Sequence, residues 1–322
     1  MNKVIETLHS VGIVPVIKIE HLEDAVPLAR ALCNGGLPVA EVTFRTDCAA
    51  DAIKAMKEAF PEMIVGAGTV LNPSQVDAAL EANSEFIVSP GLNPTTVQYC
   101  IDKGVPIIPG TSCPSDMEKA IELGLEVVKF FPAEANGGLK SIKAMSAPYG
   151  QLKFMPTGGI NPNNLNEYLA FDKIIACGGT WMVPDHLLKA KDFDAIEKLT
   201  RQAVHTMLNI RLGHVGINAD ENNSMEDLAH AFANLTGKPL ERKPASIFVD
   251  NLELMPPHSP GTKAHLGFET NDLKRTIYFL EKAGYEFDED SKRYDENGHL
   301  YFIYLKGEIG GMACHFVEKK VK

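Results

Sequence analysis

The 322-residue sequence lacks several features that mark common classes of protein. No run approaches the roughly 20 apolar residues that span a membrane. Basic residues are also in deficit, because 31 Lys and Arg stand against 42 Asp and Glu, for a formal net charge of -11. Nucleic acid binding requires a basic surface, so nucleic acid is not an expected partner. With 45% hydrophobic residues, the composition is that of a soluble globular protein.

Cysteine is scarce and irregularly placed. The six cysteines form no CxxC pair, so neither a zinc knuckle nor a disulfide framework is indicated. The apolar stretch at 11–17 is too short for a secretory signal, and Lys18 interrupts it. We therefore expect a cytoplasmic protein.

Residues 12–181 alternate short apolar strands with amphipathic helices. The strands have lost polar alternation, which is typical of parallel strands buried on both faces. We predict a (β/α)8 TIM barrel. A doubly wound open sheet is the alternative, and it is disfavoured because the first strand-to-helix turn has no GxGxxG motif. The predicted strands cover residues 12–19, 39–46, 63–70, 86–91, 106–112, 127–133, 153–160 and 173–181.

The pattern changes after a helix predicted over 195–212, which Gly213 would cap. Two similar segments follow, opening at His214-Val-Gly-Ile and His265-Leu-Gly-Phe. Each continues with a helical segment and short strands. We predict a barrel domain over 1–212 and a smaller α+β domain over 213–322, built of two βαββ-type modules of which the first is shorter.

Lys129 lies in the middle of the run Glu-Val-Val-Lys-Phe-Phe-Pro at 126–132. An ammonium group inside a buried strand is costly unless it is paired or chemically used. Desolvation favours the neutral amine, and a neutral amine can attack a ketone to form a Schiff base. The sequence therefore indicates a carbonyl-handling enzyme. A lysine that only pairs with a carboxylate is the alternative.

Further polar residues point toward the same interior. Residues two apart in a strand share a face, so Glu41 and Arg45 lie on one side of the second strand. Thr69 follows on the third strand, and closure of the barrel would bring all three close to Lys129. Lys129 would be the nucleophile, Glu41 a proton carrier and Arg45 a fork for a carboxylate. The alternative is an internal Glu41–Lys129 salt bridge with Arg45 at the rim.

The last two predicted strands end in glycine pairs. Residues 157–160 are Thr-Gly-Gly-Ile, and residues 177–180 are Cys-Gly-Gly-Thr. Glycine lets backbone amides approach an anion, and Asn161-Pro162 predicts a helix start whose dipole would add to the attraction. Loops after the seventh and eighth strands of such barrels often hold phosphate. These loops therefore predict a phosphate site.

Together these motifs resemble the family of 2-keto-3-deoxy-6-phosphogluconate (KDPG) and 4-hydroxy-2-oxoglutarate (KHG) aldolases over residues 3–205. The resemblance implies a class I aldolase, usually a homotrimer, that acts on small 2-keto acids and needs no metal or other cofactor. A 2-keto-3-deoxy-6-phosphogalactonate aldolase is the alternative within this chemistry. The resemblance rests on Glu41-Val-Thr-Phe-Arg, Gly66-Ala-Gly-Thr, Phe86-Ile-Val-Ser-Pro-Gly, Pro109-Gly-Thr, Val128-Lys-Phe-Phe-Pro-Ala, Pro156-Thr-Gly-Gly and Gly178-Gly-Thr-Trp.

The same resemblance implies roles for individual residues. Lys129 matches the Schiff-base lysine and Glu41 the acid/base. Arg45 and Thr69 match the site of the pyruvate carboxylate, with Thr157 nearby. The phosphate site would comprise Gly158, Gly159, Gly178, Gly179 and Thr180.

Residues 214–318 resemble the vicinal-oxygen-chelate (glyoxalase-like) family. That resemblance implies one divalent metal held by His214, Glu253, His265 and His315. Imidazole and carboxylate ligands suit zinc, nickel, manganese or iron. Hydrogen-bonded strand-end histidines are the alternative. Two other functions also remain open from the sequence: a metal-dependent glyoxalase-like enzyme with the barrel as scaffold, and a non-catalytic sugar-phosphate-binding protein.

Overall fold

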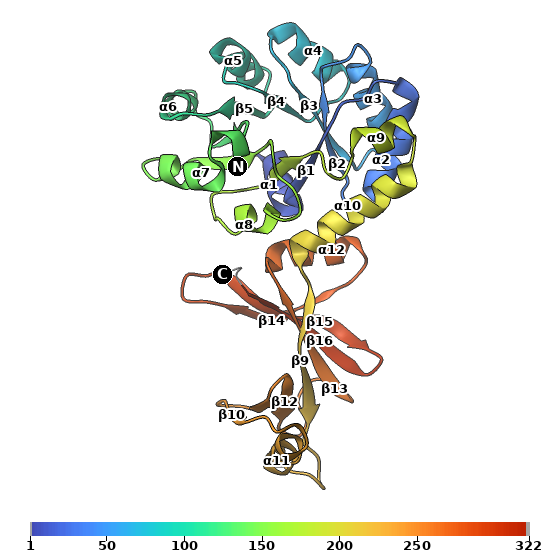
Figure 1. Cartoon of the computed structure of the whole chain (residues 1–322), viewed down its shortest axis with the longest axis vertical. Helices are drawn as coiled ribbons and strands as arrows, with labels where there is room; N and C mark the ends of the chain where they lie inside the picture. Colours follow the sequence, from blue (N-terminus) through green and yellow to red (C-terminus); the bar gives the residue numbers. More distant parts are fainter. Residues whose placement is uncertain (1, 320–322) are drawn as a thin grey trace. The chain divides into compact units, whose positions relative to one another are not determined.

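The computed structural model describes residues 2–319 and divides into two compact units between Met207 and Leu208 (Figure 1). The helix expected to run to residue 212 is α10 (Phe193–Leu208), and it ends four residues earlier than expected. Gly213 does not cap it. Instead, Gly213 lies inside β9 (Arg211–Asn218), because Leu212 and His214 on either side pair with β13. The division between Met207 and Leu208 lies five residues before the boundary expected at 212/213.

The first unit is the (β/α)8 barrel expected from the strand pattern. Its strands are all parallel, in the order β7-β6-β5-β4-β3-β2-β1-β8. Bridges from Phe154 to Ile174 and from Thr157 to Gly178 join β7 to the β8 segment and close the cylinder, which excludes the open sheet. Each strand is shorter than predicted: β1 (Ile13–Ile17), β2 (Val39–Thr43), β3 (Ile64–Gly68), β4 (Phe86–Ser89), β5 (Ile107–Thr111), β6 (Val127–Phe130), β7 (Lys153–Pro156) and β8 (Cys177–Gly179).

Local sequence explains where several barrel helices begin. Asn72 and Asn93 cap α4 and α5 with their side chains, and each is followed by a proline in the first turn. The helix start expected at Asn161-Pro162 is absent. The Asn161 side chain closes a turn on Asn163, and α8 begins only at Leu165. The barrel helices are α1 (Lys3–Val11), η1 (Leu22–Asp24), α2 (Ala25–Asn34), α3 (Ala49–Ala59), α4 (Pro73–Glu81), α5 (Pro94–Asp102), α6 (Pro114–Glu122), η2 (Glu134–Asn136), α7 (Gly138–Ser146), α8 (Leu165–Leu169), α9 (Asp185–Lys189) and α10.

The second unit is one eight-stranded sheet in the order β10-β11-β12-β9-β13-β16-β15-β14. Its two halves repeat one strand, one helix and three strands, so the modules are βαβββ and not βαββ, and the first lacks no strand. The missed strand, β10, has three residues, of which Glu241 and Arg242 are charged and exposed. The halves comprise β9, α11 (Met225–Thr236), β10 (Leu240–Arg242), β11 (Ile247–Val249) and β12 (Leu252–Met255), then β13 (Ala264–Thr270), α12 (Leu273–Lys282), β14 (Phe287–Tyr294), β15 (Leu300–Ile309) and β16 (Met312–Glu318).

Both helices of this unit pack on the same face of the sheet. Ala229 of α11 lies in one core cluster with Ile247 and Leu254, and Leu273 of α12 lies in another with Ile303 and Phe316. Because successive side chains in a strand alternate between faces, the residues next to these core positions lie on the opposite face. We call this opposite side the helix-free face.

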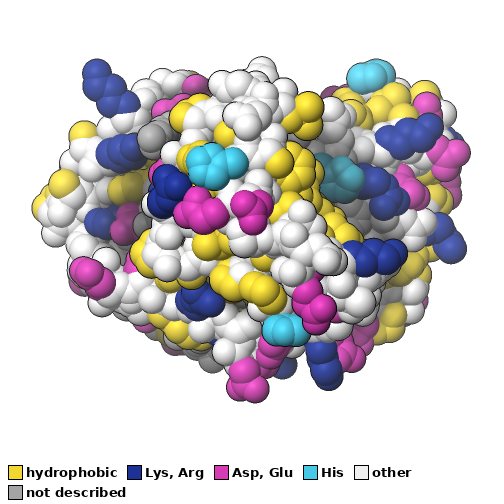
Figure 2. Space-filling model, turned by 90° about the horizontal axis from the view of Figure 1, so that it is seen from below, with side chains coloured by type: hydrophobic (Ala, Val, Ile, Leu, Met, Phe, Trp, Pro, Cys, Tyr) yellow, Lys and Arg dark blue, Asp and Glu magenta, His cyan; other side chains and the backbone are white. Residues whose placement is uncertain are grey.

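The surface carries both signs of charge. The face seen in Figure 2 mixes acidic, basic and apolar side chains, and no single charge sign covers it. Within residues 2–319, each helix is too short or too polar to cross a lipid bilayer.

Candidate active site

A buried lysine and a buried glutamate meet inside the barrel. Lys129 on β6 is 5% exposed, Glu41 on β2 is 1% exposed, and the Lys129 Nζ lies 3.3 Å from the Glu41 Oε1. The Nζ also lies 5.0 Å from the centre of the Phe131 ring. The second carboxylate oxygen, Glu41 Oε2, is buried without a hydrogen-bond partner among residues 2–319. A buried polar atom left without a partner indicates that a ligand or water completes the site.

Glycine on the neighbouring strand makes room for the Glu41 carboxylate. A Cβ at Gly68 would stand 2.4 Å from Glu41 Oε1 and 2.7 Å from its Cγ. Real Cβ atoms do not approach so closely, so Gly68 on β3 fixes where the carboxylate lies.

Gly68→Ala should therefore displace Glu41 and lower kcat with the barrel still folded. Displacement by about 1 Å can lower a rate on the order of 100-fold. Steady-state kinetics and circular dichroism measure the two effects. Gly150→Ala is the matched control, because a Cβ at Gly150 meets no atom within 4 Å. Equal kcat in both variants would show that the position of Glu41 is not critical.

Arg45 and Thr69 lie together beyond the ends of β2 and β3. The Arg45 Nε donates a hydrogen bond of 3.3 Å to the Thr69 Oγ1. Thr69 has a φ of 57°, in the left-handed region that a β-branched residue rarely adopts. Such strain is typical of functional sites, where the surrounding structure holds a side chain in place.

A cavity of about 510 Å³ at this end of the barrel joins most of the predicted residues. Thr69 is not among the residues that line the cavity, but it accepts a hydrogen bond from Arg45, which does line it. Gly178 lies behind Thr157, since a Cβ at Gly178 would stand 2.3 Å from the Thr157 Oγ1. That buried hydroxyl has no hydrogen-bond partner among the described residues, so it is available to a ligand. Of the predicted site residues, the cavity is lined by Glu41, Arg45, Lys129, Thr157, Gly158, Gly159, Gly179 and Thr180.

The loop after β7 depends on its two glycines. Gly158 and Gly159 have φ values of 99° and 87°, which side chains other than glycine rarely tolerate. The backbone amides of Ala133 and Glu134 donate to the carbonyls of Thr157 and Gly158 at 2.8 and 3.0 Å. These bonds tie the loop to the segment that follows β6, so its backbone faces the cavity in a fixed conformation.

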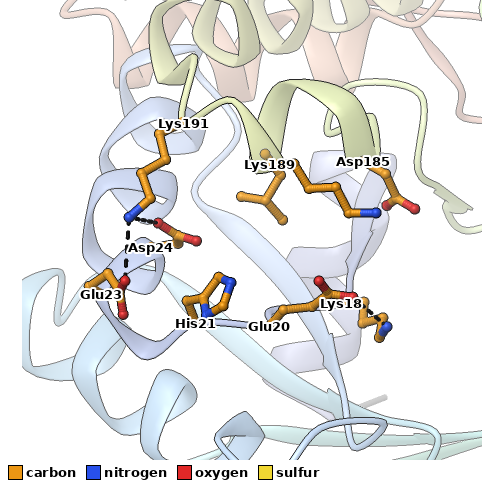
Figure 3. Close-up of a pocket in the computed structure, with 9 residues that line it drawn as sticks. Lys18, Glu20, His21, Glu23, Asp24, Asp185, Lys189 and Lys191 are labelled. Atoms are coloured by element: carbon orange, nitrogen blue, oxygen red, sulfur yellow. Dashed lines mark hydrogen bonds and ion pairs between the residues drawn. The ribbon is translucent and has the colours of Figure 1, made fainter.

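The sequence did not indicate the residues at the mouth of this cavity. Lys18, Asp185 and Leu188 line the cavity and also a second hollow beside it (Figure 3). Lys18 forms an ion pair of 2.7 Å with Glu20, and its hydrogen bond lowers the pKa of Glu20. Lys18 was detectable as the residue that ends the apolar run of β1. Asp185 at the start of α9 gave no comparable signal.

The second unit brings its four predicted residues together on the helix-free face. The Nε2 atoms of His214 and His265 are 3.2 Å apart, and each lies 3.1 Å from Glu253 Oε2. The ring nitrogens of His214, His265 and His315 offer ligand atoms within 4.8 Å of one another. Ligand atoms bound to one ion at about 2.0–2.1 Å are about 2.9–3.4 Å apart in octahedral or tetrahedral coordination, and the separations of 3.1 and 3.2 Å among His214, His265 and Glu253 lie in this range.

Hydrogen bonds alone cannot make all three contacts among His214 Nε2, His265 Nε2 and Glu253 Oε2 favourable. If both Nε2 atoms carry protons, the two N–H groups oppose each other. If either lacks one, its lone pair faces the carboxylate or the other lone pair. With the carboxylate ionised, one of the three contacts is therefore unfavourable in every tautomer, whereas a cation at the centre would be attracted to a lone pair of each of the three atoms.

Two glycines make room for the histidine rings. A Cβ at Gly216 would stand 1.8 Å from the His265 ring, and one at Gly267 would stand 2.1 Å from the His214 ring. Burial, with smaller contributions from His214 and His265, lowers the pKa of His315 to about 3, so its imidazole is neutral. Burial alone would raise the pKa of Glu253, but hydrogen bonds from His214, His265 and Ser246 lower it. Neutral imidazoles and a carboxylate are the protonation states that bind metal.

A lysine paired with a carboxylate near the carboxyl end of a closed βα barrel is characteristic of class I aldolases, which form a Schiff base with their substrate. Residues 4–199 match the family described as KDPG and KHG aldolase. The chain belongs to this family, and its barrel is a class I KDPG/KHG aldolase.

Individual relatives are similar over about three fifths of the chain. The chain is 48% identical to the 2-dehydro-3-deoxy-phosphogluconate aldolase of Treponema pallidum (strain Nichols), over 63% of this chain and 97% of the relative. It is 49% identical to the KHG/KDPG aldolase of Escherichia coli (strain K12), over 60% of this chain and 90% of the relative.

A solved structure agrees with this assignment. The KDPG aldolase of Legionella pneumophila, determined with pyruvate captured as a covalent carbinolamine, is 38% identical. It superposes with a TM-score of 0.60 over 62% of this chain and 97% of that structure. The match to the family ends at residue 199, so it does not include the second unit.

Proposed function

We propose that Lys129 is the Schiff-base nucleophile of this aldolase and Glu41 its proton carrier. The observation that supports both roles most directly is the buried contact of 3.3 Å between the Lys129 Nζ and the Glu41 Oε1. Neutral Lys129 attacks the C2 ketone and forms a carbinolamine. Glu41 assists the loss of water, which leaves a protonated imine.

The protonated imine is an electron sink for bond cleavage. As a base takes the proton of the C4 hydroxyl, the C3–C4 bond breaks and its electrons form an enamine. The enamine is protonated at C3, and water then releases pyruvate and regenerates the Lys129 amine. The aldehyde product is glyceraldehyde 3-phosphate from the KDPG substrate and glyoxylate from the KHG substrate.

Arg45 and Thr69 would hold the carboxylate next to the ketone. Arg45 lines the cavity and donates to Thr69, so its remaining N–H groups can pair with a carboxylate. The glycine loops and Thr180 would bind the phosphate at the other end of the cavity. Gly178 contributes indirectly, by admitting the Thr157 side chain.

Arg45→Lys should raise KM for the 2-keto acid with a smaller effect on kcat. Lysine keeps the charge but loses the planar fork and the Nε–H that bonds Thr69. The loss of one charge-assisted hydrogen bond corresponds to about a 10- to 100-fold increase. Initial-rate kinetics measure it, with Arg201→Lys on the exposed surface of α10 as control. An unchanged KM would remove Arg45 from the carboxylate site.

We infer from the family resemblance that the chain assembles as a homotrimer in the cytoplasm. The six cysteines, all within the described residues, form no disulfide, which suits a reducing compartment. Light scattering of the purified chain would test the trimer.

We also propose that the second unit binds a divalent metal through His214, Glu253, His265 and His315. Two observations support this metal site. The contacts among His214, His265 and Glu253 are not all favourable in any tautomer, and Gly216 and Gly267 leave room for the two histidine rings. Zinc, nickel, manganese or iron suits this donor set and would supply a Lewis acid on the helix-free face.

His265→Ala should lower the bound metal from about one equivalent per chain to near zero. Elemental analysis after gel filtration measures the content. His230→Ala is the control, since His230 lies exposed on α11 of the same unit. Aldolase turnover should survive EDTA in all three proteins. Equal metal content in the parent and His265→Ala would contradict the site.

A further inference from the structure

The helix-free face carries a row of side chains that continues past the four proposed ligands. Tyr304 on β15 pairs with His315, and Arg293 on β14 pairs with Phe302. Residues directly opposite in a sheet share a face, and so do Phe302 and Tyr304, which are two apart. Arg293, Phe302, Tyr304 and His315 therefore line one surface that leads away from the cluster.

These side chains are in contact along the row. The Phe302 and Tyr304 rings lie 4.8 and 4.9 Å from the His315 ring. The guanidinium carbon of Arg293 lies 4.8 Å from the centre of the Phe302 ring. No carboxylate within the described part of the chain forms an ion pair with Arg293. Stacking on an aromatic ring holds an arginine in place and leaves its N–H fork free.

With a divalent ion bound, the charges on this surface would favour an anionic ligand. A divalent ion with one glutamate ligand would keep one positive charge. Arg293 adds a second positive charge, on the far side of the Phe302 ring from His315. Four protein ligands leave two positions of an octahedral ion for adjacent oxygen atoms. The surface therefore suits a molecule with a pair of neighbouring oxygens at one end and a carboxylate at the other.

We infer that the helix-free face of the second unit binds a 2-oxo dicarboxylate, with the 2-oxo acid end on the metal and the distal carboxylate on Arg293. This inference rests on the proposed metal site. The path from Arg293 to the His315 ring consists of two contacts of 4.8 Å. The first joins the guanidinium carbon to the centre of the Phe302 ring, and the second joins that ring to the His315 ring. A five-carbon diacid is about 5 Å long, and its metal and hydrogen-bond contacts add about 2 and 3 Å, so it can span the row.

The barrel supports this choice of ligand independently. Its family acts on KDPG and KHG, both of which are 2-oxo acids, and KHG is itself a five-carbon 2-oxo dicarboxylate. One chain thus combines an aldolase for such acids with a surface that fits them. The second unit would bind a substrate-like acid without forming an imine, because the groups assigned to the acid are metal ligands and Arg293 and include no lysine.

A cobalt-loaded full chain tests the inference through the visible absorption of Co²⁺, which responds only to groups bound to the metal. The chain carries Lys129→Met, so that the barrel forms no imine with the probes. The probes are 2-oxoglutarate and 2-oxopentanoate, which have the same length and differ in the distal carboxylate. Both should change the spectrum, with 2-oxoglutarate about tenfold tighter because its distal carboxylate pairs with Arg293.

Arg293→Gln should abolish the preference between the two probes. Arg242→Gln, at an exposed arginine paired with Glu226 in the same unit, should preserve it. Cobalt retained after gel filtration excludes removal of the ion by the acid. Retained cobalt with no spectral response to either probe would overturn this inference but not the metal site. Failure to take up cobalt would overturn both. A preference that survives Arg293→Gln would exclude the role of Arg293.

Discussion

Lys129→Met should lower aldolase turnover by a factor on the order of 10⁵, because the variant has no amine to attack the ketone. Methionine fills nearly the same volume as lysine and removes only the amine. Lys129 is 5% exposed and pairs with Glu41 among the described residues, and the carboxylate that the variant leaves unpaired can take up a proton. We therefore expect the barrel to remain folded, with the loss confined to kcat.

The control for this variant is Lys119→Met. Lys119 forms a surface ion pair with Glu122 on α6, at 2.9 Å, with 39% of its side chain exposed. This control should keep the parent rate. Turnover by Lys129→Met within tenfold of the parent would show that another group attacks the ketone. Thermal unfolding of both variants separates loss of chemistry from loss of fold.

Glu41→Gln should lower kcat by about 10²- to 10⁴-fold, the usual contribution of a positioned acid or base. The amide retains the shape of the carboxylate and can still contact Lys129, but it cannot carry a proton. Imine formation with pyruvate should persist at a reduced rate, because Lys129 remains. Stopped-flow measurement of pyruvate binding, compared with steady-state turnover, distinguishes these steps.

Glu122→Gln, the other half of the exposed α6 pair, is the matched control for this second variant. It should leave both rates unchanged. If Glu41→Gln turned over at the parent rate, the proton carrier would lie elsewhere in the cavity. Asp185 would be the next candidate, since it lines the same cavity.

The barrel site was largely predictable because strand alternation determines which side chains meet. Glu41 and Lys129 lie inside β2 and β6, where a period of two places them inward once the barrel closes. The same rule does not reach the loops. Lys18 and Asp185 lie beyond regular strands, and the Asn161 turn satisfies its own backbone where a helix was expected. Loop conformation depends on such local hydrogen bonds, which the sequence pattern does not specify.

The second unit shows the same limit at the level of strand register. The family resemblance placed His214 and His265 on opening strands, but the space for their rings depends on Gly216 and Gly267 across the ladder. Arg293 pairs with Phe302 through a strand that contains bulges, so its place in the row followed only from the observed pairing. β10 was not predicted because it is a short edge strand with two charged, exposed residues, so its sequence shows no apolar run.

Borohydride reduction in the presence of pyruvate tests the central chemical claim most directly. The reduced adduct is stable, and mass spectrometry of a proteolytic digest identifies the lysine that carries it. We predict one modified residue, Lys129, and complete loss of aldolase activity in proportion to its modification. An adduct at any other lysine, or no adduct while cleavage of the 2-keto acid proceeds, would contradict the mechanism.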